Sequence, residues 1–179
     1  MKRLLITFLA PFVVASSLNA AVDMFLQLDG IKGESKDTKY PETIEIESFS
    51  WGASNTGASG GGGGAGKVIM QDVHFVAKVS KASPQLLLAC AEGKHIPKAV
   101  LYGRKAGDDG RTQDYLTITL EDVFITSVSQ TGRTPTSAGG DSRPTEEVAF
   151  YYNRIAFRYL ADDGTETIGS AVRTPTPAQ

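Results

Sequence analysis

Short runs of alternating hydrophobic and polar residues, separated by polar or glycine-rich stretches, make up most of this chain. The first run covers residues 24–28 and ends at Asp29, and a second begins at Ile44 and continues to Trp51. Alternation with a period of two is typical of strands that bury one face, and glycine and proline between the runs mark turns. The pattern therefore predicts two strands joined by the polar segment 29–43.

Similar alternation predicts further strands along the rest of the chain. Residues 68–80 form one expected strand, with Val73, Phe75, Ala77 and Val79 on a common face. Other strands are expected at residues 99–105, 115–120, 123–129, within 147–160, and at 165–168. The connections between them are expected to be a glycine-rich loop at 52–66, a hairpin turn at 107–110, a long loop at 131–145 and a turn at 162–164.

One segment has the features of a short helix. Ser83 is a predicted N-cap, Pro84 suits the first turn, and residues 86–91 supply an apolar body. Gly93, followed by Lys94, is the predicted end. This is the only helix that we expect after residue 20.

Many short strands with one helix predict a mainly β fold: an antiparallel β-barrel, closed or nearly closed, with the helix at its side. Three expected strands carry apolar residues on both faces, at 99–102, 123–125 and 148–152. Their outer faces therefore need a second burial surface. A neighbouring subunit would provide it, or the helix and long loops of the same chain would cover them, and the pattern does not choose between the two.

The first twenty residues have the three parts of a Sec signal peptide. Lys2 and Arg3 are the basic start, residues 4–15 are apolar, and residues 16–20 are small. We expect cleavage after Ala20 or Ala21 and export from the cell, with passage through the periplasm as one route. The expected division is a signal peptide at 1–20, one folded domain at 21–172 and a disordered tail at 173–179. Alternatively, the start codon is assigned too far upstream, Met24 or a nearby residue begins the natural chain, and the protein stays cytoplasmic before export.

Composition excludes several classes of function. The 179 residues carry a net charge of −2, which becomes −4 when Lys2 and Arg3 leave with the first 20 residues, so nothing favours nucleic acid as a partner. The apolar stretch near the start is too short to span a bilayer, which takes about 20 residues, and no other segment comes close, so no stable membrane insertion is expected. The single cysteine, Cys90, cannot form a disulfide within the chain.

Several segments resemble the Hcp proteins, the tube-forming proteins of type VI secretion systems. They read DMFLQLDGIKGESKD, IEIESFSWG, QDVHF, KASPQLLLACAEGKHI and LEDV, starting at residues 23, 44, 71, 81 and 120. The resemblance implies a ring-forming barrel subunit that assembles into homohexameric rings, which stack into a hollow tube that carries or exports effector proteins. It also implies a spike protein, a contractile sheath and effector proteins as partners, and it implies a role in virulence.

The signal peptide is a departure from this family, whose members are normally made in the cytoplasm and loaded without Sec. The alternative function is therefore an Hcp-like binding module, exported through Sec and acting outside the cytoplasm as a monomer or an isolated ring.

Motifs that look catalytic lack their structural context. Residues 61–67 match a phosphate-binding loop, but Val68 replaces the metal-binding hydroxyl and a strand, not a helix, is expected to follow. The residues around Ser59 match the G-x-S-x-G sequence of a nucleophile elbow, but Ser59 lies in a glycine run that cannot hold the strained turn of such an elbow. Cys90 is most simply a core residue rather than the partner of His95, and two histidines in separate elements give no metal-ligand spacing. We expect no enzyme activity, cofactor or metal.

The remaining candidates are residues that would contact another subunit or ring. Charges in the turn Lys32, Glu34, Lys36 and Asp37 are either solvated or paired across an interface. The resemblance implies that the glycine-rich segment holding Gly60, Gly64 and Lys67 contacts the next ring. Phe124 and Tyr151 are also predicted contacts, because they lie on the outer faces of strands that carry apolar residues on both sides. Trp51 is expected to pack against the barrel end, with an interface role as the alternative.

Overall fold

The computed structural model describes residues 22–55, 68–106, 111–132 and 142–173. Ten strands and one helix lie in these ranges: β1 (Val22–Leu28), β2 (Ile44–Ser50), β3 (Ala53–Asn55), β4 (Val68–Met70), β5 (Val73–Lys78), α1 (Ser83–Glu92), β6 (His95–Ala106), β7 (Thr112–Thr131), β8 (Thr145–Tyr151), β9 (Arg154–Leu160) and β10 (Glu166–Val172). The expected cleavage site at Ala20 or Ala21, residues 56–66 of the expected glycine loop and the turn at 107–110 fall outside the described residues. The start of that loop was predicted wrongly, because Ala53–Asn55 form strand β3, which pairs with β4.

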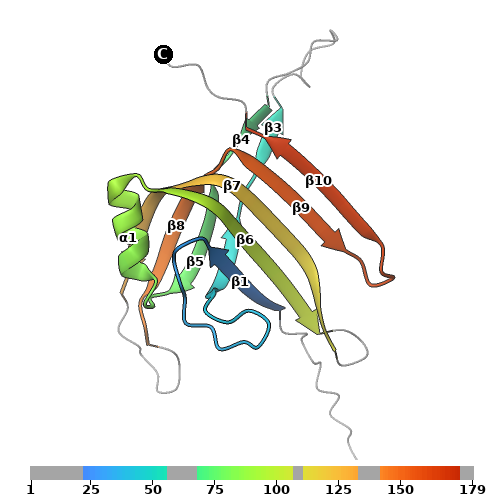
Figure 1. The fold of residues 1–179 in the computed structure, drawn as a ribbon, viewed down its shortest axis with the longest axis horizontal. Helices are drawn as coiled ribbons and strands as arrows, with labels where there is room; N and C mark the ends of the chain where they lie inside the picture. Colours follow the sequence, from blue (N-terminus) through green and yellow to red (C-terminus); the bar gives the residue numbers. More distant parts are fainter. Residues whose placement is uncertain (1–21, 56–67, 107–110, 133–141, 174–179) are drawn as a thin grey trace, which may run out of the picture.

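Six of the strands close into an antiparallel barrel (Figure 1). The main sheet has the order β10-β9-β7-β6-β1-β2-β5-β8, and β8 pairs again with β7. The closed circuit is thus β7-β6-β1-β2-β5-β8, and β9 and β10 extend from β7 as a hairpin at the side, which we call the side hairpin. The predicted mainly β barrel with one short helix is confirmed.

Strand β7 belongs to both the barrel and the side hairpin. Its first half pairs with β6 on one edge and β9 on the other, and its second half pairs with β8. The change of partner lies at Asp122, which has a positive φ of 53°. The sequence suggested two strands here, at 115–120 and 123–129, but they are one strand of 20 residues with an irregular residue between its halves.

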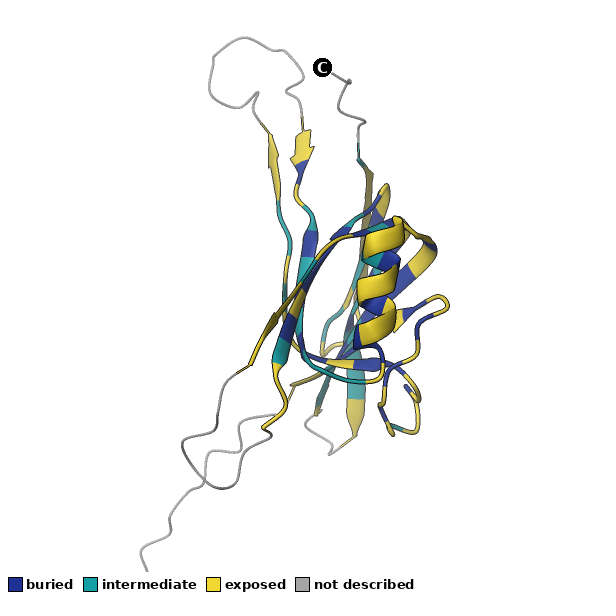
Figure 2. Ribbon diagram, turned by 90° about the vertical axis from the view of Figure 1, so that its left-hand side faces the viewer, coloured by how far each residue is buried: buried dark blue, intermediate teal, exposed yellow. Residues whose placement is uncertain are grey.

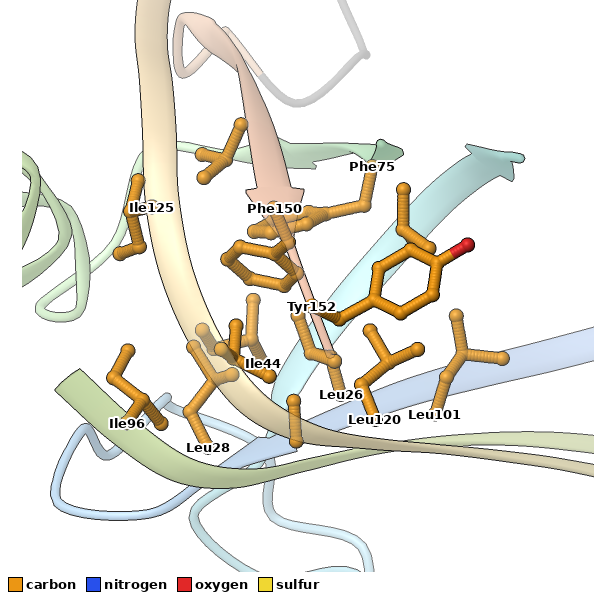
Figure 3. Close-up of a cluster of buried hydrophobic side chains, with 14 of the residues drawn as sticks. Leu26, Leu28, Ile44, Phe75, Ile96, Leu101, Leu120, Ile125, Phe150 and Tyr152 are labelled. Atoms are coloured by element: carbon orange, nitrogen blue, oxygen red, sulfur yellow. The ribbon is translucent and has the colours of Figure 1, made fainter. Parts of the chain in front are cut away.

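The barrel interior is a continuous apolar core (Figure 3). Phe75 of β5 and Phe150 of the neighbouring strand β8 pack within it as tilted rings with centroids 5.2 Å apart, and Ile96 is fully buried. Val73, Phe75 and Ala77 are buried on one face of β5, as predicted. The expected strand at 68–80 is nevertheless divided, because Gln71 and Asp72 separate β4 from β5.

Helix α1 covers one side of the barrel and differs from the prediction at its start. Ala82, not Ser83, is the N-cap, and no side chain caps the helix. Ser83 is buried and donates its hydroxyl to Glu146 at 2.8 Å, so its side chain is engaged with the barrel. The end is as predicted, with Gly93 in the left-handed conformation. Figure 2 shows the exposed outer face of α1, which carries Leu87 and Leu88.

The outer faces of the strands that carry apolar residues on both sides are partly covered within the chain. Val100 and Ala149 are buried in the single chain, and Tyr102 is half-buried beneath Tyr40 of the segment 29–43. Of the two alternatives, cover by a segment of the same chain therefore applies at Tyr102, whereas Phe124 and Tyr151 on the same outer faces are only half-buried.

The last part of the chain also differs in detail from the predicted pattern. Tyr152 and Asn153 separate β8 from β9 inside the segment 147–160, and β10 is longer than the expected strand at 165–168. Arg173, where the disordered tail was expected to begin, is held against the barrel. Its backbone N–H donates to the Asn153 carbonyl at 2.7 Å, and its guanidinium lies 2.8 Å from Asp72.

Candidate assembly surfaces

The segment between β1 and β2 is a structured cover on the outside of the barrel. Residues on its two arms bond to each other: the N–H of Gly33 donates to the Glu42 carbonyl at 2.7 Å, and the N–H of Ser35 donates to the Thr43 carbonyl at 3.1 Å. Gly33 has to be glycine, since a Cβ atom there would lie 2.1 Å from the Thr43 carbonyl oxygen. This local pairing shapes the charged turn that the sequence singled out.

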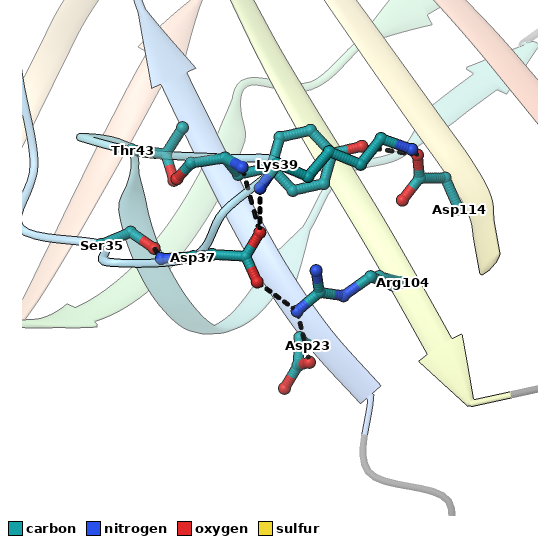
Figure 4. A network of polar contacts seen from close by, with 8 residues as sticks. Asp23, Ser35, Asp37, Lys39, Thr43, Arg104 and Asp114 are labelled. Atoms are coloured by element: carbon teal, nitrogen blue, oxygen red, sulfur yellow. Dashed lines mark hydrogen bonds and ion pairs between the residues drawn. The ribbon is translucent and has the colours of Figure 1, made fainter. Parts of the chain in front are cut away.

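Arg104 fastens this cover to the barrel wall (Figure 4). Its guanidinium lies 3.0 Å from Asp23 on β1 and 2.7 Å from Asp37 on the cover, and it sits over the ring of Phe25 at 4.9 Å. The hydrogen bond from Arg104 holds the pKa of Asp37 below its ordinary value. One cation thus joins three segments that are distant in the sequence.

A second fastening point involves aromatic rings and another carboxylate. The ring of Tyr40 stacks on Tyr102 with centroids 4.4 Å apart, and its hydroxyl donates to Asp114 at 2.6 Å. Lys39 also pairs with Asp114 (Figure 4). Burial, followed by the hydrogen bond to Asp114, raises the pKa of Tyr40 far above its ordinary value. A hydroxyl that stays protonated keeps donating this bond across the physiological pH range.

The predicted contact residues of the charged turn have different surroundings. Lys32 is exposed and pairs with Glu42 at 2.7 Å. Glu34 accepts the N–H of Lys81 at 2.9 Å and lies 3.6 Å from Arg143. Lys36 is exposed, and Asp37 is the partner of Arg104 described above. As contacts with another subunit these four residues stay predictions.

The other predicted contact residues are not gathered with them. Phe124 is half-buried beside the ring of His95 at 5.2 Å, and Tyr151 is half-buried beneath the Arg173 guanidinium at 4.3 Å. Gly60, Gly64 and Lys67 lie outside the described residues. Trp51 is half-buried, packs against the core, and contacts Phe157 of the side hairpin at 6.2 Å.

The side hairpin carries the inner layer of the barrel out to an uncovered edge. Three rows of neighbouring residues cross from β7 through β9 to β10: Leu116, Tyr159 and Thr167; Ile118, Phe157 and Gly169; Leu120, Ile155 and Ala171. Each row is buried at its β7 end and exposed at its β10 end. All seven residues of β10 are exposed, and this strand pairs with β9 alone. The sequence marked this strand but gave no sign that it is uncovered.

Reactive side chains are dispersed over the described part of the chain. His95 lies 3.0 Å from Asp122 and packs on Phe124, so its ring is engaged there and not with Cys90. Among the described residues, no group of three or more His, Cys, Asp or Glu side chains is placed to hold a metal ion. Within the same ranges, no helix has the length and apolar character needed to cross a membrane.

The fold and these surfaces define a class of protein: a small β-barrel whose distinctive features are a braced outer cover and a projecting sheet edge. Residues 25–159 match the family model described as type VI secretion system effector, Hcp. The chain is 44% identical over 141 residues to protein hcp1 of Pseudomonas aeruginosa, an alignment that covers 78% of this chain and 83% of the relative. These matches show that the chain belongs to the Hcp family of type VI secretion system proteins.

Solved structures agree with this assignment. Hcp1 of Salmonella typhimurium has a TM-score of 0.70 at 33% identity, over 85% of this chain and 95% of that one. A type VI secretion system effector of Yersinia pestis has a TM-score of 0.69 at 31% identity, over 84% of this chain and 99% of that one. The family is a structural one within the secretion system, which is consistent with a protein that is not an enzyme, and membership supports export.

Proposed function

We propose that the protein is a structural tube subunit of a type VI secretion system, and that it forms homohexameric rings that stack and carry or export effector proteins. The observation that supports this most directly is the side hairpin, because β10 is an exposed strand that pairs with β9 alone among the described strands, and an open sheet edge favours association with another chain. In this proposal the spike protein, the contractile sheath and effector proteins are the other partners.

The first twenty residues favour a second candidate. If the signal peptide at 1–20 is used, the mature domain at 21–172 would be exported through Sec and would act outside the cytoplasm as a monomer or isolated ring. The two candidates differ in their N-terminus and in their assembly. Both keep the barrel, the cover and the side hairpin.

Native mass spectrometry of the full chain expressed in its host, after N-terminal sequencing, tests both. A hexamer that stacks into longer particles supports the tube subunit. Cleavage after Ala20 or Ala21, together with monomers or single rings, supports the exported module. A strictly monomeric protein with an intact residue Met1 would contradict both.

A further inference from the structure

Strands β3 and β4 form a small sheet of their own, the small β3–β4 sheet, which two short connections join to the barrel. Among the described strands these two pair only with each other, and all their residues but Met70 are exposed (Figure 2). Trp51 and Gly52 lead from β2 into β3, and Gln71 and Asp72 lead from β4 into β5. The contacts of these four residues therefore set the direction in which the small β3–β4 sheet projects.

A backbone hydrogen bond ties the two connections to each other. The N–H of Gln71 donates to the Gly52 carbonyl at 2.9 Å. The pairing of β2 with β5 in the main sheet reaches Ser50 and His74 and does not extend to the connections. A region with few backbone bonds to its surroundings opens more easily than a continuous sheet. The direction of the small β3–β4 sheet therefore depends on side-chain contacts at the connections.

The side hairpin supplies a contact to each connection. The ring of Trp51, on the first connection, lies 6.2 Å from the ring of Phe157 on β9, which is within the range of attractive aromatic pairs. Asp72, on the second connection, lies 2.8 Å from the guanidinium of Arg173, directly after β10. Two neighbouring strands of one hairpin thus hold the two connections.

The contact between Arg173 and Asp72 is part of a network of little-exposed groups. The two side chains are 20% and 25% exposed. The Arg173 guanidinium lies over the ring of Tyr151 at 4.3 Å, and its backbone N–H donates to the Asn153 carbonyl at 2.7 Å. The second carboxylate oxygen of Asp72 accepts the Thr126 hydroxyl of β7 at 2.9 Å. Such a network contributes more than an isolated exposed ion pair, so Asp72 is fixed between β7 and the end of β10.

We propose that the side hairpin braces the small β3–β4 sheet and sets its direction, with Arg173 as the positioning residue that acts through Asp72. The inference rests on the proposed function, in which the segment between β3 and β4 meets the next ring. If the hairpin moves, the contacts of Asp72 and Trp51 are lost together, and the small β3–β4 sheet has no fixed direction. The brace therefore links the side hairpin to the strands that lead toward the next ring.

Hydrogen exchange of the full chain, followed by mass spectrometry of its peptides, tests the brace. Arg173→Gln removes the charge that binds Asp72. We expect exchange at Gln71 to become about tenfold faster or more, the factor for a lost hydrogen bond to a charged group, while β6 exchanges as in the wild type. Arg173→Lys keeps the charge and should retain most of the protection. Arg154→Gln removes an ion pair with Glu121 beside the end of β10, and as the matched control it should leave exchange at Gln71 unchanged.

A second substitution tests whether Arg173 acts through Asp72. Asp72→Asn should speed exchange at Gln71 as much as Arg173→Gln does. The double variant should be no faster than either single variant, because all three lack the same contact. Electron microscopy should show shorter stacks in each of them, while native mass spectrometry shows rings of unchanged size.

The outcomes for the brace and for the tube subunit are distinguishable. Unchanged exchange at Gln71 in Arg173→Gln, equal acceleration throughout β6, or additive effects of the two substitutions would overturn the brace and leave the tube subunit standing. Stacks of normal length despite faster exchange would overturn the link to stacking. A parent protein that forms neither rings nor stacks would overturn the tube subunit, whereas the exchange rates would still decide whether these contacts direct the small β3–β4 sheet.

Discussion

At the scale of single residues, two little-exposed charged groups each join separate elements of the fold. Arg104 is only 13% exposed and bridges two carboxylates that lie 81 and 67 positions before it in the chain. Glu146 is 1% exposed and binds the Ser83 hydroxyl and the Gln130 amide. Through Asp37, Arg104 holds the outer cover to β6, and through Ser83, Glu146 holds the start of α1 to β8.

Acid should weaken the bond between the cover and the barrel. The pKa of Asp37 is lowered in the folded protein, so its contribution to stability is present above its ordinary pKa of 3.8 and is lost as pH falls through the lower folded value. We therefore expect the midpoint of denaturation to fall in both proteins as the pH decreases from neutral. Below pH 3.8 it should fall less steeply in Asp37→Asn than in the wild type. Thr38→Ser, at the exposed neighbouring position, should keep the wild-type slope.

Removal of the Glu146 carboxylate should loosen the start of α1. Glu146→Ala leaves the buried Ser83 hydroxyl without its acceptor, and a buried polar group that loses its partner costs about 1 to 3 kcal/mol. Glu146→Gln keeps an acceptor oxygen at the same place and should lose less stability. Urea unfolding of both variants measures the difference, and equal losses would show that the hydrogen bond is not what matters.

At the scale of elements, the cover between β1 and β2 is set by close backbone approach. Its arms meet where Gly33 faces Thr43, and Glu42 beside them has a positive φ of 56°. This contact holds the segment over Phe25 and Tyr102, whose outer faces would otherwise be open to solvent.

Gly33→Ala should therefore be far more damaging than a second glycine substitution in the same segment. The added Cβ would lie 2.1 Å from the Thr43 carbonyl oxygen, an overlap that forces a backbone shift and costs about 2 to 3 kcal/mol. Gly30→Ala meets no atom within 4 Å but has a φ of +81°, so strain alone should cost about 1 kcal/mol. Thermal unfolding and limited proteolysis of the cover would compare them. Equal effects would contradict the steric argument.

The elements were largely predictable from the sequence, and their long-range contacts were not. Alternation located the buried face of β5, and Gly93 located the end of α1. The sequence did not indicate that β7 continues through Asp122, because an acidic pair after Leu120 looks like a turn. Nor did it predict the contact of Arg104 with Asp37 or of Tyr40 with Asp114, since nothing local records which distant carboxylate a side chain will meet.

At the scale of the whole molecule, rings and stacks would use different surfaces. The side hairpin continues the main sheet beyond the barrel, whereas β3 and β4 form a separate two-stranded sheet that pairs Ala53 with Met70 (Figure 1). The segment that joins β3 to β4 contains the glycine run.

Shortening the glycine run should separate the two kinds of assembly. Deletion of residues 60–64 should weaken the stacking of rings and leave the rings intact, because it changes no residue of the barrel strands or the side hairpin. Electron microscopy and native mass spectrometry would report stack length and ring size. Replacement of the same residues by five serines keeps the length and is the control. Unchanged stacks after the deletion would contradict this role.

The anchored position of Arg173 decides where any added polypeptide would emerge. Its contacts with Asp72, just after β4, and with the Asn153 carbonyl fix the end of β10 beside the small β3–β4 sheet. A passenger protein or purification tag fused behind this arginine would thus start next to the strands that lead into the glycine run. Fusion at that terminus should hinder end-to-end contacts between particles before it disturbs lateral ones, so labelling experiments are better served by another attachment point.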